Sequence, residues 1–232
     1  MKLVWSPETA LKSYIDTVKL KSCEKFKESG VAELLSSMAA GWNAKFIVEC
    51  YSHGGPIAAS IGLAVAARNT GARHVCIVRD EGTRQHYTKA LAEMGVSPPP
   101  EIVHGEAETV IKSLDGLDFL VVDCRLRDFA RVLKVAKVST RGAVLACKNA
   151  WQRSNFSWFK WNMVLERGTR VVRSVFLPVG MGLDIAYIGS GNGGGGGGAS
   201  SSAGSSKNAA SRWIKCIDQQ SGEEHLYRES RF

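Results

Sequence analysis

The sequence predicts an α/β protein with a mostly parallel seven-stranded sheet and helices on both faces. Five short apolar runs recur between residues 46 and 147, each separated from the next by enough chain for a crossover helix. Two further apolar runs, at 169–177 and 183–189, are joined by a turn too short for a crossover, so they form an antiparallel hairpin. Parallel strands that are apolar throughout require helices on both sides of the sheet.

Length and composition favour one domain followed by a tail. The chain has 232 residues, enough for an α/β domain with a sizeable core. Its 30 Lys and Arg exceed its 22 Asp and Glu, and the net charge of +8 favours anionic partners without choosing among them. The six cysteines are scattered and suit a reducing compartment. Because we find no signal peptide and no apolar run near the ~20 residues of a membrane span, we expect a cytoplasmic or nuclear protein.

Residues 1–41 are expected to form two helices that pack on the body of the domain. Ser6 fits an N-cap and Pro7 the first helical position. Each helix carries one apolar stripe: Leu11, Tyr14, Ile15 and Val18 on the first, then Val31, Leu34, Leu35 and Met38 on the second, which stops near Gly41. We expect both stripes to be buried.

A strand, a glycine turn and a helix follow. The strand at 46–48 leads to Glu49, Gly54 with Gly55 permits a sharp turn, and Pro56 fits the first helical turn. A helix starting there would offer free N–H groups and partial positive charge to an anion or to the polar part of a nucleotide-like ligand. An ordinary strand-to-helix turn that needs glycine to close explains the pattern equally well.

The rest of the α/β domain, predicted to span residues 1–189, repeats this order. We expect strands at 74–78, 101–104, 118–122 and 143–147, with helices at 83–94, 106–114 and about 126–138. The aromatic-rich segment from Trp151 is predicted to be helical as far as Glu166. Residues 190–211, rich in Gly and Ser, fit a flexible linker, and residues 212–232 fit a hairpin that docks on the body or folds on a partner.

The order of these elements resembles the Rossmann-like class I fold of S-adenosylmethionine-dependent methyltransferases, especially the small-molecule O-methyltransferases. The resemblance covers about residues 6–189, and LPVGMGLDIAYIG at 177–189 is similar to the closing hairpin of those enzymes. The chain resembles still more closely a plant family of uncharacterised methyltransferase-like proteins, a domain of unknown function. This resemblance implies S-adenosylmethionine as the cofactor, bound at the carboxyl ends of the strands.

The resemblance implies positions for the amino-acid end of that cofactor. Glu49 matches the acidic residue that ends the first strand, and Gly55, after Gly54, matches the last glycine of the loop. Tyr51 stands where the family has its first glycine. A phenol at this place would fill space that the methionine moiety uses.

The resemblance also implies ribose and adenine positions. Where the family has an acid that binds both ribose hydroxyls, this chain has Arg79, and Asp80 or Glu81 would substitute by a shift of register. An arginine there would instead suit a phosphorylated ribose or another anion. The run Gly105-Glu106-Ala107 resembles the family's adenine-side triplet, with Glu in place of Asp.

The acceptor side departs from the metal-dependent O-methyltransferases. Asp123 matches a carboxylate that is a magnesium ligand in those enzymes, whereas Lys148 and Asn149 stand where they carry Asp and Asn. Because an ammonium group competes with a hard cation, this exchange predicts that no metal is bound. Lys148 then either forms a salt bridge with Asp123 or acts as a general base.

Three other groups have structural explanations beside functional ones. Cys50, Cys124 and Cys147 end strands that the fold would place together and could bind zinc, although buried cysteine on strands is commonplace. The helix at 126–138 carries a basic stripe that would be a solvated face or would bind phosphate. The stripe consists of Arg127, Arg131 and Lys134, with Arg125, Lys137 and Arg141 at its ends. The aromatic residues at 151–161 would cover the sheet, contact a partner or stack on a flat substrate.

The sequence therefore predicts a protein that binds S-adenosylmethionine or a related adenine-type ligand. The leading hypothesis is metal-independent methyl transfer to a small molecule, with Asp123 or Lys148 orienting the acceptor. A catalytically silent scaffold, binding a protein partner through its tail or aromatic residues, is a second hypothesis. An RNA-binding or RNA-modifying protein, suggested by charge alone, is a third.

Overall fold

The chain divides into two compact units, residues 1–193 and residues 194–232. The computed structural model describes residues 4–20, 30–151, 159–190, 212–217 and 224–229. The first unit is an α/β domain, and the described part of the second is a pair of strands.

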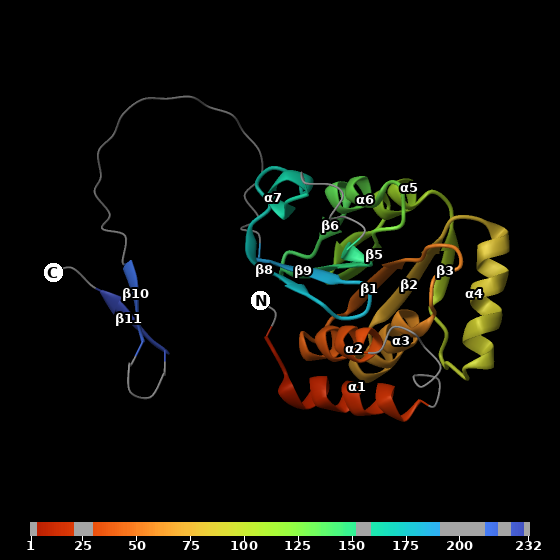
Figure 1. Cartoon of the computed structure of the whole chain (residues 1–232), viewed down its shortest axis with the longest axis horizontal. Helices are drawn as coiled ribbons and strands as arrows, with labels where there is room; N and C mark the ends of the chain where they lie inside the picture. Colours follow the sequence, from red (N-terminus) through yellow and green to blue (C-terminus); the bar gives the residue numbers. More distant parts are fainter. Residues whose placement is uncertain (1–3, 21–29, 152–158, 191–211, 218–223, 230–232) are drawn as a thin grey trace. The chain divides into compact units, whose positions relative to one another are not determined.

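A seven-stranded sheet forms the centre of the first unit (Figure 1). Its strands are β1 (Phe46–Cys50), β2 (Arg73–Val78), β3 (Glu101–His104), β5 (Phe119–Asp123), β7 (Ala143–Lys148), β8 (Val171–Leu177) and β9 (Leu183–Ile188). They lie in the order β3-β2-β1-β5-β7-β9-β8. The first five pair in parallel, whereas β9 runs antiparallel to both β7 and β8. The predicted mostly parallel sheet with a closing hairpin is confirmed.

The strand order reverses between β1 and β5. The chain adds β2 and β3 on one side of β1, then crosses over to place β5 on its other side. In open parallel sheets, ligands bind outside the carboxyl ends of the strands at such a reversal. The topology therefore directs attention to the loops that follow β1, β2, β3 and β5.

Helices cover both faces of the sheet. One face carries α1 (Pro7–Lys19), α2 (Val31–Gly41) and α3 (Ala58–Thr70), and the opposite face carries α5 (Ala107–Lys112), α6 (Phe129–Val135) and α7 (Trp161–Val164) (Figure 1). Helix α4 (Glu81–Glu93) packs against β2 and β3.

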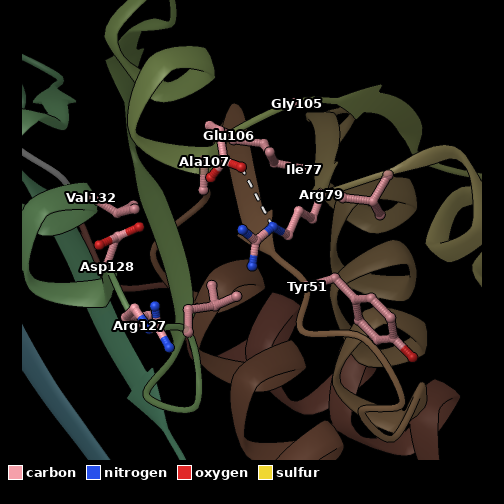
Figure 2. Close-up of a pocket in the computed structure, with 11 residues that line it drawn as sticks. Tyr51, Ile77, Arg79, Gly105, Glu106, Ala107, Arg127, Asp128 and Val132 are labelled. Atoms are coloured by element: carbon pink, nitrogen blue, oxygen red, sulfur yellow. Dashed lines mark ion pairs between the residues drawn. The ribbon is translucent and has the colours of Figure 1, made fainter.

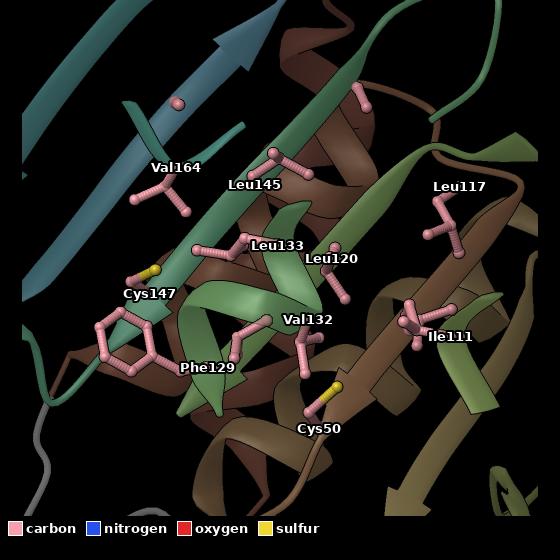
Figure 3. Packing of buried hydrophobic residues seen from close by; sticks show 14 of the residues in the cluster. Cys50, Ile111, Leu117, Leu120, Phe129, Val132, Leu133, Leu145, Cys147 and Val164 are labelled. Carbon is pink, nitrogen blue, oxygen red and sulfur yellow. The ribbon is translucent and has the colours of Figure 1, made fainter. Parts of the chain in front are cut away.

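Alternation along the strands divides the core between the two faces. In β1, Ile47 packs on the layer of α2 and α3, whereas Val48 and Cys50 pack on the opposite layer. Figure 3 shows Cys50 among the side chains of that opposite layer. Because both faces are covered, the strands are apolar throughout rather than in alternation. Among the described residues, charged side chains enter the interior at the carboxyl ends of β1, β5 and β7 and also at Asp118, just before β5.

Several boundaries differ from the sequence-based expectation. Helix α3 begins at Ala58, so Pro56 precedes it instead of lying in its first turn. The helix expected at 126–138 is observed only as α6, Phe129–Val135. The residues after it form β6 (Lys137–Val138), which pairs with β4 (Asp115–Leu117) in a small parallel sheet. Helix α4 begins two residues early because the Asp80 carboxylate accepts a hydrogen bond from the Thr83 amide.

The expectation of buried stripes is wrong for α1. This helix buries its small residues Ala10, Ser13 and Thr17, while the stripe of Leu11, Tyr14, Ile15 and Val18 is exposed. Small side chains let α1 approach α2 closely, and the Thr17 hydroxyl donates to Ser36 Oγ across that contact at 2.9 Å. Polar contacts between small residues, rather than apolar area, orient the helix.

Two predicted segments lie partly outside the described residues. Of the helix expected over 151–166, the structure shows α7 at Trp161–Val164, and residues 152–158 lie outside the described chain. Residues 191–211, most of the predicted linker, also lie outside the described chain. In the second unit, β10 (Arg212–Ile217) and β11 (Glu224–Glu229) pair in antiparallel register. Within the described parts of the chain, no helix has the length and apolarity that crossing a membrane requires.

Candidate functional site

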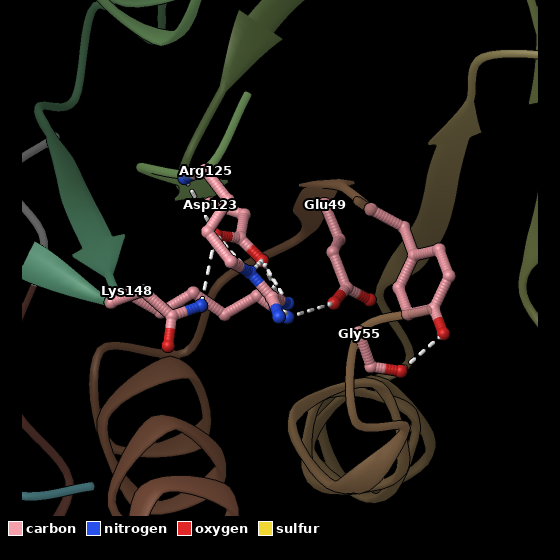
Figure 4. Close-up of polar contacts among 7 residues, drawn as sticks. Glu49, Gly55, Asp123, Arg125 and Lys148 are labelled. Carbon is pink, nitrogen blue, oxygen red and sulfur yellow. Dashed lines mark hydrogen bonds and ion pairs between the residues drawn. The ribbon is translucent and has the colours of Figure 1, made fainter. Parts of the chain in front are cut away.

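Three charged side chains meet at the carboxyl ends of neighbouring strands (Figure 4). Glu49, Asp123 and Lys148 lie at or near the ends of β1, β5 and β7, and the strand register turns all three toward the face covered by α2 and α3. Lys148 Nζ lies 3.5 Å from Glu49 Oε1 and 4.0 Å from Asp123 Oδ2. None of the three side chains is more than 2% exposed. We call them, together with Arg125 and Asn149, the charged cluster.

Arg125 and Asn149 complete the bonding of Asp123. The Arg125 guanidinium donates to Asp123 Oδ2 at 2.7 Å, its backbone amide donates to Oδ1 at 2.9 Å, and the Asn149 amide nitrogen also donates to Oδ1 at 2.9 Å. Burial alone would raise the pKa of Asp123, but these bonds and the Lys148 charge outweigh it and hold the pKa below its usual value. Asp123 is therefore a buried, fully ionised carboxylate.

Within the charged cluster, Lys148 acts as the counter-ion of two carboxylates. This arrangement matches the salt bridge considered for Lys148 and Asp123, extended to Glu49. The second oxygen of Glu49, Oε2, is buried and has no hydrogen-bond partner among the described residues. An unpaired buried carboxylate oxygen is energetically costly. It is the place in the cluster where a donor from outside the chain would gain a strong bond.

The glycine turn after β1 closes against this cluster. Gly54 adopts a left-handed conformation, with φ of 66°, and the Gly55 amide donates to the Ser52 carbonyl at 2.9 Å. A Cβ on Gly55 would come within 2.8 Å of the Ser52 carbonyl oxygen, which is backbone and cannot turn aside, and within 2.7 Å of Arg125 Nη2, so only glycine fits here. Since the Gly55 amide is bonded inside the turn and α3 starts three residues later, the turn offers fewer free N–H groups than the sequence suggested.

Tyr51 holds the turn instead of leaving room for a ligand beside it. Its hydroxyl donates to the Gly55 carbonyl, and its ring packs edge to face on Tyr87 with centroids 4.8 Å apart. The Tyr51 residue is only 2% exposed, and burial, as the largest cause, raises the pKa of its phenol to about 12. Its ring points away from the hollow described next (Figure 2).

A hollow lies beside the glycine turn, outside the ends of β1, β2 and β3 (Figure 2). About 440 Å³ of space not filled by atoms lies among its lining residues, open solvent included. Its walls are apolar and its rim is charged. The residues that line it are Tyr51, Ile77, Val78, Arg79, Gly105, Glu106, Ala107, Leu126, Arg127, Asp128 and Val132.

An ion pair crosses this hollow. Arg79 Nε lies 3.4 Å from Glu106 Oε1, with both side chains more than half exposed (Figure 2). Exposed pairs of this kind are worth at most about 1 kcal/mol, so a ligand could displace one partner at low cost. Arg79 therefore lies across the hollow and has to turn aside before a ligand can enter it.

The acids that could replace Arg79 by a register shift lie elsewhere. Asp80 caps α4, and Glu81 pairs with Arg84 at 2.8 Å in the first turn of the same helix. Neither lines the hollow. Of the sequence-predicted positions, Tyr51, Arg79 and the run Gly105-Glu106-Ala107 do line it, while Glu49, Asp123, Lys148 and Asn149 belong to the charged cluster.

The sequence reasoning missed the loop after β5. Leu126, Arg127 and Asp128 line the hollow, and Arg125 covers the charged cluster. The spacing Asp123-x-Arg125 was a usable signal, since an arginine two residues after a strand-ending carboxylate can fold back on it. From the sequence, Arg125 and Arg127 are considered only as members of a basic helix stripe.

The other candidate groups are structural where the chain is described. Cys50, Cys124 and Cys147 lie in the apolar core, and no three His, Cys, Asp or Glu side chains of the described residues gather closely enough to hold a metal ion. The Trp161 indole donates to Asp184 at 2.8 Å, and Phe159 stacks on Phe129. These aromatic residues cover the sheet face beside α6.

Comparison with known proteins gives a family and a fold. The family described as "Protein of unknown function (DUF1442)" matches residues 1–229. Comparison with curated proteins gives no match.

Solved structures resemble this one over most of its length. A methyltransferase from Geobacter sulfurreducens has a TM-score of 0.55 at 21% identity, covering 76% of this chain and 89% of its own. The O-methyltransferase TomG from Streptomyces achromogenes, in complex with S-adenosylmethionine, has a TM-score of 0.52 at 22% identity, covering 81% and 92%. A methyltransferase from Podospora anserina bound to S-adenosylhomocysteine has a TM-score of 0.54 at 17% identity, covering 79% and 89%. The fold is thus the Rossmann-like fold of class I methyltransferases, as predicted.

Proposed function

Since the chain belongs to the DUF1442 family, whose function is unknown, we propose a function from its fold and its site: it binds S-adenosylmethionine or a related adenine-type ligand. The adenosine part of the ligand occupies the hollow beside the glycine turn. The observation that carries this proposal is the hollow itself, an apolar slot with a charged rim at the reversal of strand order.

The chemistry of the hollow supports a flat, partly polar ligand. Ile77, Ala107 and Val132 offer apolar surface to a heterocycle. The Glu106 carboxylate can accept hydrogen bonds from ribose hydroxyls or an exocyclic amine once Arg79 turns aside. Two similar structures hold S-adenosylmethionine or S-adenosylhomocysteine, which supports the same ligand class here.

Methyl transfer without a metal is the activity that we propose for this ligand. The transfer needs donor and acceptor held in line, and that is a matter of positioning. Asp123 and Lys148 would orient the acceptor, but both are buried beneath Arg125. Arg125 must therefore move before an acceptor or the methionine end of the cofactor can reach them.

Isothermal titration of the full chain with S-adenosylmethionine and S-adenosylhomocysteine tests the proposal. We expect saturable heat with both ligands. Glu106→Ala should weaken binding by roughly tenfold or more, because a hydrogen bond to a charged group contributes about 1.5–3 kcal/mol. Glu101→Ala is the matched control, since Glu101 is also exposed, also ion-paired and at the other end of β3. No heat with either ligand at millimolar concentration would overturn the proposal.

A catalytically silent scaffold is the second candidate, and the charged cluster favours it. The cluster satisfies most of its own charges and is closed over by Arg125 and the glycine turn. If S-adenosylhomocysteine binds only after Arg125→Ala, the methionine end is closed in the native chain and the scaffold is favoured. Equal affinity in the native chain and in Arg125→Ala would argue against the scaffold.

A further inference from the structure

Helix α1 presents its large apolar side chains to solvent. Leu11, Tyr14, Ile15 and Val18, here called the α1 stripe, are 59%, 47%, 40% and 49% exposed. Their spacing of three, four and seven residues places them in one row along the helix. Figure 1 shows α1 as the outermost element on its face of the sheet. Single exposed apolar residues are ordinary, whereas a continuous row of four marks a binding surface.

Polar contacts fix α1 in this orientation. On its inner side the Thr17 hydroxyl donates to Ser36 Oγ at 2.9 Å, and the Asn69 side-chain amide donates to Ser13 Oγ at 2.8 Å and to Asp16 Oδ2 at 3.1 Å. Rolling the helix to bury the stripe would break these bonds and bring large side chains into a contact built for small ones. The stripe therefore stays on the surface of the described first unit, where a partner can reach it.

The charges of α1 suit a second copy of the same helix. Glu8 and Asp16 balance Lys12 and Lys19, so the helix is neutral within a chain of net charge +8 and does not repel its own copy. Glu8 and Lys19 are eleven residues apart, close to three turns, so they lie in one row beside the stripe.

We propose that α1 is a self-association surface through which two copies of the chain pair in antiparallel fashion. In an antiparallel pair related by a two-fold axis, the same flank of each helix lies at the same side of the contact. Glu8 of each copy therefore faces Lys19 of the other copy. The two stripes interdigitate, and the two helix dipoles oppose each other favourably. Because one helix of 13 residues spans only about 20 Å, the interface is small and the dimer is weak, with a dissociation constant in the micromolar range.

Sedimentation velocity of the full chain, from about 1 to 300 µM, tests the proposal. We expect a monomer–dimer equilibrium that Leu11→Glu with Ile15→Glu abolishes, leaving a monomer throughout. Both sites are exposed, so circular dichroism should show an unchanged fold. Met163→Glu is the matched control, because Met163 is an apolar residue 68% exposed on another helix, and it should leave the equilibrium unchanged.

A charge exchange tests the antiparallel arrangement. Glu8→Lys alone and Lys19→Glu alone should each weaken the dimer several-fold, because each creates two like-charged contacts. The double variant should restore the dimer, since exchanging both charges makes the facing side chains opposite in sign again. A native chain that stays monomeric at about 300 µM would overturn the proposal, and so would a dimer that ignores the stripe variants or a double variant that is not restored.

Discussion

Four charges neutralise one another inside the fold at the ends of β1, β5 and β7. Glu49 and Asp123 supply two negative charges, and Lys148 and Arg125 supply two positive ones. Such a buried group is weak evidence of stability as a whole, because desolvation offsets the attraction. Removing one charged side chain, however, lowers the free energy of unfolding, because the remaining charges lose their partner.

Asp123→Asn should therefore be strongly destabilising. The change leaves the buried Lys148 and the partly exposed Arg125 short of a negative charge, and we expect a loss of about 3–5 kcal/mol in the free energy of unfolding. Urea unfolding at neutral pH measures it. Glu101→Gln, which breaks the exposed pair with Arg73, should cost no more than about 1 kcal/mol. Similar losses in the two variants would show that the cluster contributes no more than a surface pair.

His74 makes stability depend on pH. Its ring is buried, neither nitrogen has a hydrogen-bond partner among the described residues, and burial lowers its pKa to about 3. Between that value and the ordinary 6.5, the unfolded chain binds a proton that the folded chain does not. Proton binding by His74 thus costs no stability above pH 6.5, and below that pH stability falls by about 1.4 kcal/mol per pH unit.

We expect His74→Leu to remove this part of the pH dependence. Unfolding free energies measured by urea from pH 7 to pH 4 should fall less steeply in the variant than in the native chain, with the two curves diverging below pH 6.5. His104→Gln, at an exposed position, should retain the native slope. Parallel curves for His74→Leu and the native chain would contradict the prediction.

At the scale of elements, the contact between α2 and α3 depends on one glycine. A Cβ on Gly62 would collide with the Ala32 carbonyl oxygen, which belongs to the backbone of the facing helix and cannot turn aside. Gly62→Ala should therefore destabilise the fold by about 1–3 kcal/mol despite the better helix propensity of alanine. Gly82→Ala in α4 meets no such backbone and should be neutral or slightly stabilising. Thermal unfolding of the pair measures the difference, and a stable Gly62→Ala would show that the helices can separate freely.

The sequence predicts a helix or strand correctly where a single sequence pattern is enough to determine it. Apolar runs of strand length predicted the sheet, and Ser6 with Pro7 predicted the start of α1. The orientation of α1 was not predictable, because the stripe favoured burial while hydrogen bonds at Ser13 and Thr17 decided the outcome. The cluster was predictable in part: strand ends brought carboxylates and Lys148 together, but the return of Arg125 onto Asp123 depends on a loop conformation that periodicity does not encode.

For the whole molecule, net charge overstates the free positive charge of the described surface. Around α6, Arg131 lies 3.9 Å from Glu108, Lys137 lies 2.8 Å from Asp115, and Arg141 pairs with the buried Asp118. Arg125, which the sequence places at the end of the same basic stripe, forms an ion pair with Asp123. A phosphate backbone would have to compete with these carboxylates for each contact.

RNA binding should therefore be weak and strongly dependent on salt. Each phosphate contact releases counter-ions, so retention on immobilised single-stranded RNA should be detectable near 50 mM salt and fall by orders of magnitude by about 200 mM. Arg127→Glu with Lys134→Glu, both on the basic stripe around α6, should reduce the low-salt retention further. Arg73→Glu, at the start of β2, should change RNA retention less because the basic stripe around α6 is left intact. Retention that persists at high salt, or that is unchanged in the Arg127 and Lys134 variant, would mean that the chain recognises bases or RNA shape, and would raise RNA above the other candidate partners.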